Sequence, residues 1–163
     1  MGIKMVILDR DGVINHDPGD YTYTWENFKV LPGVVESIKY LQEKGLKLVL
    51  ITNQGGIAKG RYNKEDVDKL HNSFQFYLRK EGARPFHKIY YCPHHDAIEN
   101  CLCRKPKGLM VEKALADFAI ASGEAIFFGD SERDVLAAEA ASVKGVKVER
   151  NGNLFEAIRG ILD

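Results

Sequence analysis

The chain lacks long apolar segments, net charge and the features of a signal peptide. No run of hydrophobic residues exceeds four, whereas a membrane-spanning helix needs roughly 18. The 23 Lys and Arg balance 23 Asp and Glu, and no segment carries the basic stripe that binds a nucleic-acid backbone. The N-terminal residues lack a basic region followed by a long apolar one. We therefore expect a cytoplasmic protein with neither a nucleic acid nor a membrane as partner.

Cysteine is scarce, and its placement argues against a disulfide framework. Only Cys92, Cys101 and Cys103 are present, all within 12 residues, and an odd count favours metal or redox chemistry. The 45% hydrophobic and 28% charged composition excludes a disordered chain. Repeats, low-complexity tracts and linkers are absent too. We expect one domain, residues 1–163, which can bury roughly 70% of the surface that its unfolded form exposes.

Short apolar runs alternate with stretches of helical periodicity. The runs are expected to be buried parallel strands and cover 5–8, 48–51, 89–91, 125–128 and about 146–148. Helices are expected around 34–41, 67–77, 111–118, 131–141 and 154–161. The second of these helices has Asn63 as its N-cap and Gly82 as its stop. This order predicts an α/β fold with an open, Rossmann-like parallel sheet.

Chemically distinctive residues follow four of the five expected strands. Asp9 and Asp11 follow the first, Thr52 ends the second, Cys92 ends the third and Asp130 follows the fourth. Ligands of open α/β sheets bind at the carboxyl ends of the strands. The sequence therefore predicts one shared site at this edge of the sheet.

The acid pair Asp9 and Asp11 indicates a cation. Close carboxylates repel, so they persist with a cation between them or a proton on one of them. Asp130 supplies a third acid and Asp134 a possible fourth, and oxygen ligands of this kind suit Mg²⁺. Alternatively, each aspartate caps the turn or helix that follows it. For Asp130 taken by itself, capping is as good an explanation as metal binding, but capping does not explain the joint pattern.

Groups that bind phosphate accompany the acids. The Thr52 hydroxyl and the cations of Arg104 and Lys105 are suited to charge on phosphoryl oxygens. Lys105 by itself could equally be a solvated surface lysine.

The cysteines and a histidine form the pattern C-x-H-x6-C-x-C at 92–103. Three thiolates and one imidazole make a closed tetrahedral zinc site, hence a structural one. The alternatives are buried cysteines without metal, or His95, more remotely His87, in place of His94. Because Arg104 and Lys105 follow directly, zinc here would fix the loop that carries both cations.

Four segments together resemble the ordered motifs of the haloacid dehalogenase superfamily of phosphotransferases. They are DRDGV (9–13), LVLITNQ (48–54), CRKP (103–106) and GDSERD (129–134). Three further segments resemble the D-glycero-D-manno-heptose 1,7-bisphosphate phosphatases: TNQGGIAKG (52–60), YYCPHH (90–95) and CLCRKP (101–106). The related histidinol-phosphate phosphatases share the zinc loop and most catalytic motifs. The resemblance covers 9 to about 148.

The resemblance implies specific roles for the strand-end residues. Asp9 would be the nucleophile that forms an aspartyl-phosphate, and Asp11 the general acid and then the general base. Thr52 and Lys105 would hold the phosphoryl group. To act as an acid, Asp11 needs a pKa above about 3.9, which we expect from burial and from the charge of Asp9.

The resemblance also implies ligand sets. Mg²⁺ would bind Asp9, the Asp11 backbone carbonyl and Asp130, with Asp134 outside the direct ligands. Zinc would bind Cys92, His94, Cys101 and Cys103. Substrate contacts are expected at Asp17, Pro18, Gly19, Asp20, Asn53, Gln54, Gly55, Arg104 and Ser131.

Two positions depart from the family pattern. Gly55 stands where many members have Ser, and Ser131 replaces a Lys found in some members, which removes a cation near the distal part of the substrate. The stretch 13–52 holds one loop and one helix, so no separate cap domain is expected.

We interpret the chain as a monomeric phosphatase that acts on a small sugar phosphate. It is expected to remove the 7-phosphate of a heptose 1,7-bisphosphate in nucleotide-activated heptose synthesis, which serves lipopolysaccharide or another glycan. The alternatives are a histidinol-phosphate phosphatase, a non-enzymatic phospho-acceptor like the response-regulator receivers, and a nucleic-acid 3′-phosphatase, which zero net charge disfavours.

Overall fold

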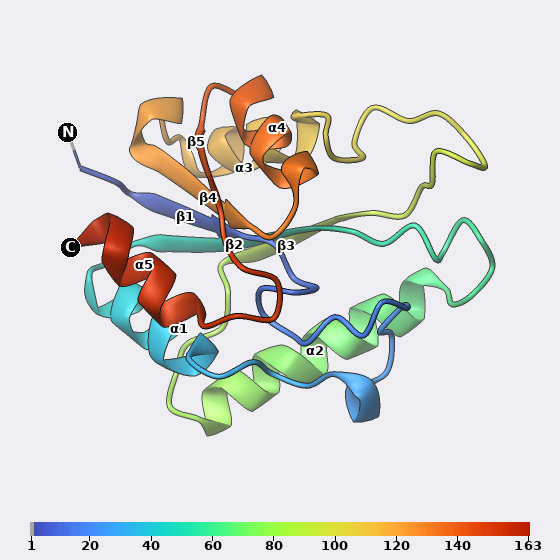
Figure 1. The fold of residues 1–163 in the computed structure, drawn as a ribbon, viewed down its shortest axis with the longest axis horizontal. Coiled ribbons are helices and arrows are strands. Elements are labelled where there is room, and N and C mark those ends of the chain that lie inside the picture. The colour runs from blue at the N-terminus through green and yellow to red at the C-terminus, as the bar shows by residue number, and fades with distance from the viewer. Residues whose placement is uncertain (1) are drawn as a thin grey trace.

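The computed structural model describes residues 2–163, in which five strands alternate with five α-helices (Figure 1). The strands are β1 Met5–Leu8, β2 Lys47–Asn53, β3 Lys88–Cys92, β4 Ala125–Gly129 and β5 Lys144–Lys147. The α-helices are α1 Val34–Glu43, α2 Lys64–Lys80, α3 Leu109–Phe118, α4 Glu132–Ala140 and α5 Leu154–Leu162. Short 3-10 helices lie at Trp25–Asn27 and Ser122–Glu124. The order confirms the predicted α/β fold.

All five strands are parallel and lie in the order β3-β2-β1-β4-β5. β1 is central, with Leu8 in register with Leu50 of β2 on one side and Phe128 of β4 on the other. The residues that follow these strands therefore emerge side by side at one edge of the sheet.

Alternation along β1 divides the core between the two faces of the sheet. Val6 and Leu8 pack with α1, α2 and α5, whereas Met5 and Ile7 pack with α3 and α4. Figure 1 shows these two helix layers on opposite sides of the strands. Both faces are covered, which explains why the inner strands are apolar at nearly every position.

The ends of α2 follow their predicted signals. The Asn63 side chain accepts from the Asp66 amide, and the Asp66 carboxylate accepts from the Asn63 amide. This reciprocal capping satisfies two otherwise free donors. Gly82, just beyond the helix, adopts the left-handed backbone conformation with φ 82°, which glycine tolerates.

The last strand begins earlier than the sequence suggests. It covers Lys144–Lys147 rather than 146–148. A Cβ on Gly145 would lie 2.9 Å from Val135 Cα, so a residue without a side chain lets this edge strand pack closely on α4. An apolar run does not mark the start of this strand, because the residue that packs on α4 there is a glycine.

The chain between β1 and α1 is a loop with one short 3-10 helix, as expected for a fold without a separate cap. Within residues 2–163, no helix combines the length and the apolar character needed to cross a membrane.

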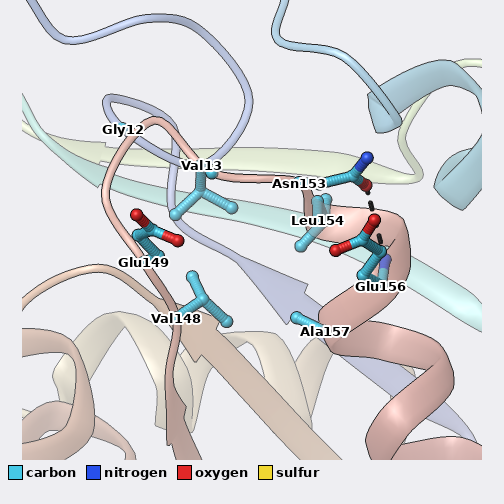
Figure 2. Close-up of a pocket in the computed structure, with 9 residues that line it drawn as sticks. Gly12, Val13, Val148, Glu149, Asn153, Leu154, Glu156 and Ala157 are labelled. Carbon is cyan, nitrogen blue, oxygen red and sulfur yellow. Dashed lines mark hydrogen bonds between the residues drawn. The ribbon is translucent and has the colours of Figure 1, made fainter.

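A small cavity lies between the loop after β1 and the start of α5 (Figure 2). Its volume is about 200 Å³, and Val13, Val148, Leu154 and Ala157 supply its apolar wall. Figure 2 shows Glu149 and Glu156 beside this wall. The lining contains no cationic side chain among the described residues, so the cavity is unsuited to a phosphate group.

Candidate active site

The predicted strand-end residues meet in a cavity of about 90 Å³, here called the inner cavity. Asp9 after β1, Thr52 of β2 and Asp130 after β4 all contribute to it, as the parallel order predicts. Its lining comprises Asp9, Asp11, Asp17, Thr52, Asn53, Lys105, Asp130, Ser131, Arg133, Asp134 and Arg150.

Lys105 lines this cavity and is buried, not solvated. Its Nζ donates to Asp9 Oδ1 at 2.8 Å, to Asp134 Oδ1 at 2.6 Å and to the Ile51 carbonyl at 3.2 Å. Burial acts to lower the pKa of Lys105, but the two carboxylates raise it above its ordinary value. The amine therefore stays protonated and fixed beside Asp9.

Three carboxylates form a cluster with the chemistry of a divalent-cation site. One oxygen each of Asp9, Asp130 and Asp134 lies within 4.8 Å of the others. Burial raises the pKa of Asp9 well above its usual range. Lys105 acts to lower this pKa, whereas the neighbouring carboxylates of Asp134 and Asp130 raise it further. A cation would stabilise the ionised form, so the donor set fits Mg²⁺.

Both oxygens of Asp134 are already used. Oδ1 accepts from Lys105, and Oδ2 accepts from the Ser131 amide at 3.2 Å and the Ser131 hydroxyl at 3.0 Å. Ser131 therefore turns its side chain toward Asp134.

Gly12 makes room for Asp130. Its φ is +86°, and a Cβ there would lie 2.2 Å from Asp130 Oδ2. Only glycine combines this left-handed conformation with the missing side chain.

Asp11 is held by three donors. Arg10 Nη2 at 2.8 Å and Asn15 Nδ2 at 3.0 Å donate to Oδ1, and Gln54 Nε2 at 3.2 Å donates to Oδ2. Burial acts to raise the pKa of Asp11, but Arg10 and the other donors outweigh it and lower the pKa below the ordinary value. The expected elevation is therefore wrong, because Arg10 turns inward to Asp11, which the sequence did not show.

Arg10 links the acid pair to the protein interior. It is 1% exposed, and its Nη2 also donates to the Thr22 carbonyl at 2.7 Å. Its Nη1 lies 3.2 Å from Nε2 of the buried His71 on α2. Burial and the Arg10 charge lower the pKa of His71 to about 3, so the imidazole is neutral at pH 7. No periodicity or motif spacing singled out either residue.

Gln54 joins Asp11 to Thr52. Its Nε2 donates to Asp11 and, at 3.0 Å, to Thr52 Oγ1. Its Oε1 accepts from the Tyr62 hydroxyl at 2.6 Å. Tyr62 in turn stacks on Tyr23, with ring centroids 4.9 Å apart. The Tyr62 bond fixes which end of the amide faces Asp11 and Thr52.

A second cavity of about 460 Å³, the outer cavity, adjoins the inner one. The two share Asp11, Asp17, Asn53, Arg133 and Arg150. The outer lining comprises Asp11, Asp17, Gly19, Asp20, Tyr21, Thr22, Asn53, Gln54, Gly55, His95, Arg104, Arg133 and Arg150.

Most of the predicted substrate residues line these cavities, with two differences. Pro18 lines neither of them, and Ser131 lines only the inner one. Sequence reasoning missed Tyr21, Arg133 and Arg150 as lining residues. Arg150 lies after β5 and its Nε donates to Asp130 Oδ2 at 2.7 Å, a contact that only the folded chain reveals.

Asn53 ties β2 to the loop that carries Lys105. Its side chain accepts from the Lys105 amide at 3.0 Å and donates to the Lys105 carbonyl at 3.1 Å. It therefore positions Lys105 as well as lining both cavities.

The absence of a side chain at position 55 has a steric reason. A Cβ on Gly55 would lie 2.7 Å from His95 Cδ2 and 2.9 Å from Arg104 Nη1. In this chain, serine at 55 would displace the two residues that form this wall of the outer cavity.

The four predicted zinc ligands lie together. One ligand atom each of Cys92, His94, Cys101 and Cys103 lies within 4.8 Å of the others. Cys92 Sγ lies 3.7 Å from Cys101 Sγ and 3.0 Å from Cys103 Sγ. Three thiols and one imidazole are a donor set that zinc favours. Burial raises the pKa of the Cys92 thiol, so its thiolate form depends on a cation.

The alternative histidines lie elsewhere. His95 lines the outer cavity, and His87 Nδ1 accepts from the Leu48 amide at 3.1 Å. The cluster also contacts the site, because the Arg104 amide donates to Cys101 Sγ at 3.4 Å and Arg104 Nη1 to the His94 carbonyl at 3.0 Å.

Known proteins resemble this chain in sequence and in fold. A family model for haloacid dehalogenase-like hydrolases matches residues 6–142. A D-glycero-beta-D-manno-heptose-1,7-bisphosphate 7-phosphatase of Haemophilus ducreyi is 38% identical over 162 residues, 96% of this chain and 88% of that protein. The Vibrio cholerae enzyme of the same name is 41% identical over 91% of this chain and 81% of its own length.

A solved structure agrees with these relatives. The crystal structure of a D,D-heptose 1,7-bisphosphate phosphatase from B. bronchiseptica, complexed with magnesium and phosphate, has a TM-score of 0.85 and 30% identity. The match covers 99% of this chain and 89% of that one. The chain belongs to the haloacid dehalogenase-like hydrolases and, within them, to the family of the D-glycero-beta-D-manno-heptose-1,7-bisphosphate 7-phosphatases.

Proposed function

We propose that the protein hydrolyses the 7-phosphate of D-glycero-D-manno-heptose 1,7-bisphosphate in nucleotide-activated heptose synthesis. The observation that carries this proposal is Asp9, buried beside Lys105 in an inner cavity of about 90 Å³ that adjoins a larger polar one. The names of the relatives support the substrate. They favour the heptose substrate over histidinol phosphate.

Mg²⁺ would be held by Asp9, the Asp11 backbone carbonyl and Asp130, and would neutralise charge on the phosphoryl oxygens. The presence of magnesium and phosphate in the B. bronchiseptica structure supports this assignment. Asp134, whose oxygens bind Lys105 and Ser131, positions the lysine rather than the metal.

In the first step, an Asp9 oxygen attacks phosphorus, and the bond from phosphorus to the sugar oxygen breaks. Asp11 transfers a proton to that leaving oxygen. Lys105 and the Thr52 hydroxyl stabilise the phosphoryl oxygens, since phosphoryl transfer depends mainly on positioning and charge neutralisation. The required stabilisation is large, on the order of 20 kcal/mol or more. Forming an aspartyl-phosphate divides the reaction into two easier steps.

In the second step, water attacks the phosphorus of the aspartyl-phosphate while Asp11 accepts a proton from that water. The bond from phosphorus to the Asp9 oxygen breaks, which releases inorganic phosphate and restores the Asp9 carboxylate. The lowered pKa of Asp11, caused by its three donors, supports this base role. The acid role requires the substrate, whose phosphate charge raises the pKa of a neighbouring carboxyl. The same residue therefore changes protonation between the two steps.

We also propose that Cys92, His94, Cys101 and Cys103 hold a structural zinc ion. Zinc there would order the loop ahead of Arg104 and Lys105, because the Arg104 amide contacts Cys101 and its side chain contacts the His94 carbonyl. A monomeric state and a cytoplasmic location remain predictions.

The test compares phosphate release from both heptose 1,7-bisphosphate anomers and from histidinol phosphate, with added Mg²⁺. We expect the heptose to have the highest kcat/KM, and Asp9→Asn to abolish both turnover and the aspartyl-phosphate. Asp117→Asn, which changes an exposed acid that contacts Lys88, is the matched control. Faster turnover of histidinol phosphate would overturn the substrate. Activity in Asp9→Asn would overturn the mechanism, and a stable phosphoprotein without turnover would indicate the phospho-acceptor.

A further inference from the structure

The outer cavity is lined by more cations than the reacting phosphate requires. Lys105 already stands beside Asp9 in the inner cavity. Arg104, Arg133 and Arg150 line the outer cavity in addition, and two of them line both cavities.

Most of the acids at these cavities have partners of their own. Arg10 binds Asp11 at 2.8 Å, and Arg61 lies 3.4 Å from Asp20. Arg150 pairs with Asp130 at 2.7 Å. Asp17 Oδ1 accepts from the Gly19 amide.

Arg133 differs from the other two arginines. Across residues 2–163 it has no carboxylate partner. By contrast, Arg150 binds Asp130, while Arg104 donates to the His94 carbonyl and lies 3.5 Å from Asp96. The guanidinium of Arg133 is therefore available to an anionic ligand.

The neighbouring side chains support this assignment. Arg133 lines the outer cavity together with Arg104 and His95, so the two arginine side chains border the same space. Ser131, at the residue before α4, is bound to Asp134 and has no charge. Arg133 thus places a cation two residues further on, in the first turn of the same helix.

We propose that Arg133 binds a second anionic group of the substrate, the phosphate at the far end of the sugar, and thereby determines a preference for bisphosphates over monophosphates. The proposal rests on the proposed function. Ser131 carries no charge, so Arg133 supplies the cation at the start of α4 that borders both cavities. A planar guanidinium binds a phosphate through two parallel hydrogen bonds, which adds orientation to charge.

The test uses two substrates that differ only in the second phosphate, heptose 1,7-bisphosphate and heptose 7-phosphate. In Arg133→Ala, we expect the ratio of kcat/KM for bisphosphate over monophosphate to fall at least tenfold, mainly through KM for the bisphosphate. Arg133→Lys keeps the charge and should retain part of the ratio. Glu132→Gln changes the charge at the neighbouring exposed position and should leave the ratio unchanged.

Two outcomes would overturn the role of Arg133. One is an unchanged ratio in Arg133→Ala. The other is an equal loss on both substrates, which would place Arg133 at the reacting phosphate. The proposed function is tested separately by the rates at which the wild-type protein hydrolyses the two heptose phosphates. If the wild-type protein hydrolyses neither heptose, the same ratio is measured with glucose 1,6-bisphosphate and glucose 6-phosphate, and the same two outcomes decide.

Discussion

Acidification is expected to destabilise the protein through one buried histidine. His71 is 5% exposed, and its Nε2 lies 3.2 Å from the Arg10 guanidinium. Burial and that charge lower its pKa to about 3, compared with about 6.5 in an unfolded chain. A proton on His71 would place two cations, His71 and Arg10, in contact inside the protein. Arg10 is also the residue that binds Asp11.

The direction and the size of this loss of stability follow from proton linkage. Between pH 6.5 and 3 the unfolded chain binds a proton at this residue that the folded protein does not, so the free energy of unfolding falls as the pH decreases. Each pH unit within this window costs about 1.4 kcal/mol. His71 alone should therefore remove about 3 kcal/mol by pH 4 and about 4 kcal/mol by pH 3, a large part of the typical total of about 5–15 kcal/mol.

The assay is urea unfolding followed by circular dichroism from pH 7 to pH 4, on the wild-type protein and on His71→Gln. Glutamine keeps an oxygen that accepts from Arg10 but does not titrate, and the carboxylates contribute equally to both proteins. The wild-type stability should fall by about 3 kcal/mol more than that of the variant across this range. His16→Gln, at an exposed histidine, should follow the wild type. Parallel curves for the wild type and His71→Gln would refute the reasoning.

Three further predictions concern the network, the lysine and the cysteine cluster. Tyr62→Phe should lower kcat severalfold, because Gln54 loses the bond that orients its amide. Tyr23→Phe removes a hydroxyl from the ring stacked on Tyr62 without touching Gln54, and an equal effect there would contradict the role of the Tyr62 bond. Lys105→Met should abolish activity and destabilise the metal-free protein by about 3–5 kcal/mol in urea, since it leaves buried carboxylates without their cation; a change below about 1 kcal/mol in the same titration would contradict the contacts of Lys105. Cys92→Ser should lose bound zinc by elemental analysis and become sensitive to proteases within 94–101, and a wild-type protein purified without zinc would contradict the assignment.

The fold was predictable where a local sequence pattern determines the secondary structure. Buried parallel strands such as β4 appear as uninterrupted apolar runs, and Asn63 marks the start of α2 by its capping chemistry. The start of β5 was not predictable, because Gly145 packs closely on α4 only since it has no side chain. Tertiary contact, rather than local preference, sets that boundary.

The site was predictable as far as strand topology determines it. Asp9, Thr52 and Asp130 meet because their strands are adjacent and parallel. The lowered pKa of Asp11 was not predictable, because it depends on the contact of Asp11 with Arg10. Arg10 is held in this inward position by Thr22 and α2. Contacts that cross between distant elements leave no periodic pattern in a sequence.

The sheet order also determines how the chain could be divided. The residues before the exposed turn at Glu81 and Gly82 carry Asp9, whereas those after it carry Lys105 and every predicted zinc ligand. A break at this turn would separate Asp9 from Lys105, its buried cation, and leave each fragment inert. Reassembly would have to restore the pairing of β2 with β3 and of β1 with β4. The fold therefore offers a split enzyme whose recovered phosphatase activity would report that two fused partners have met.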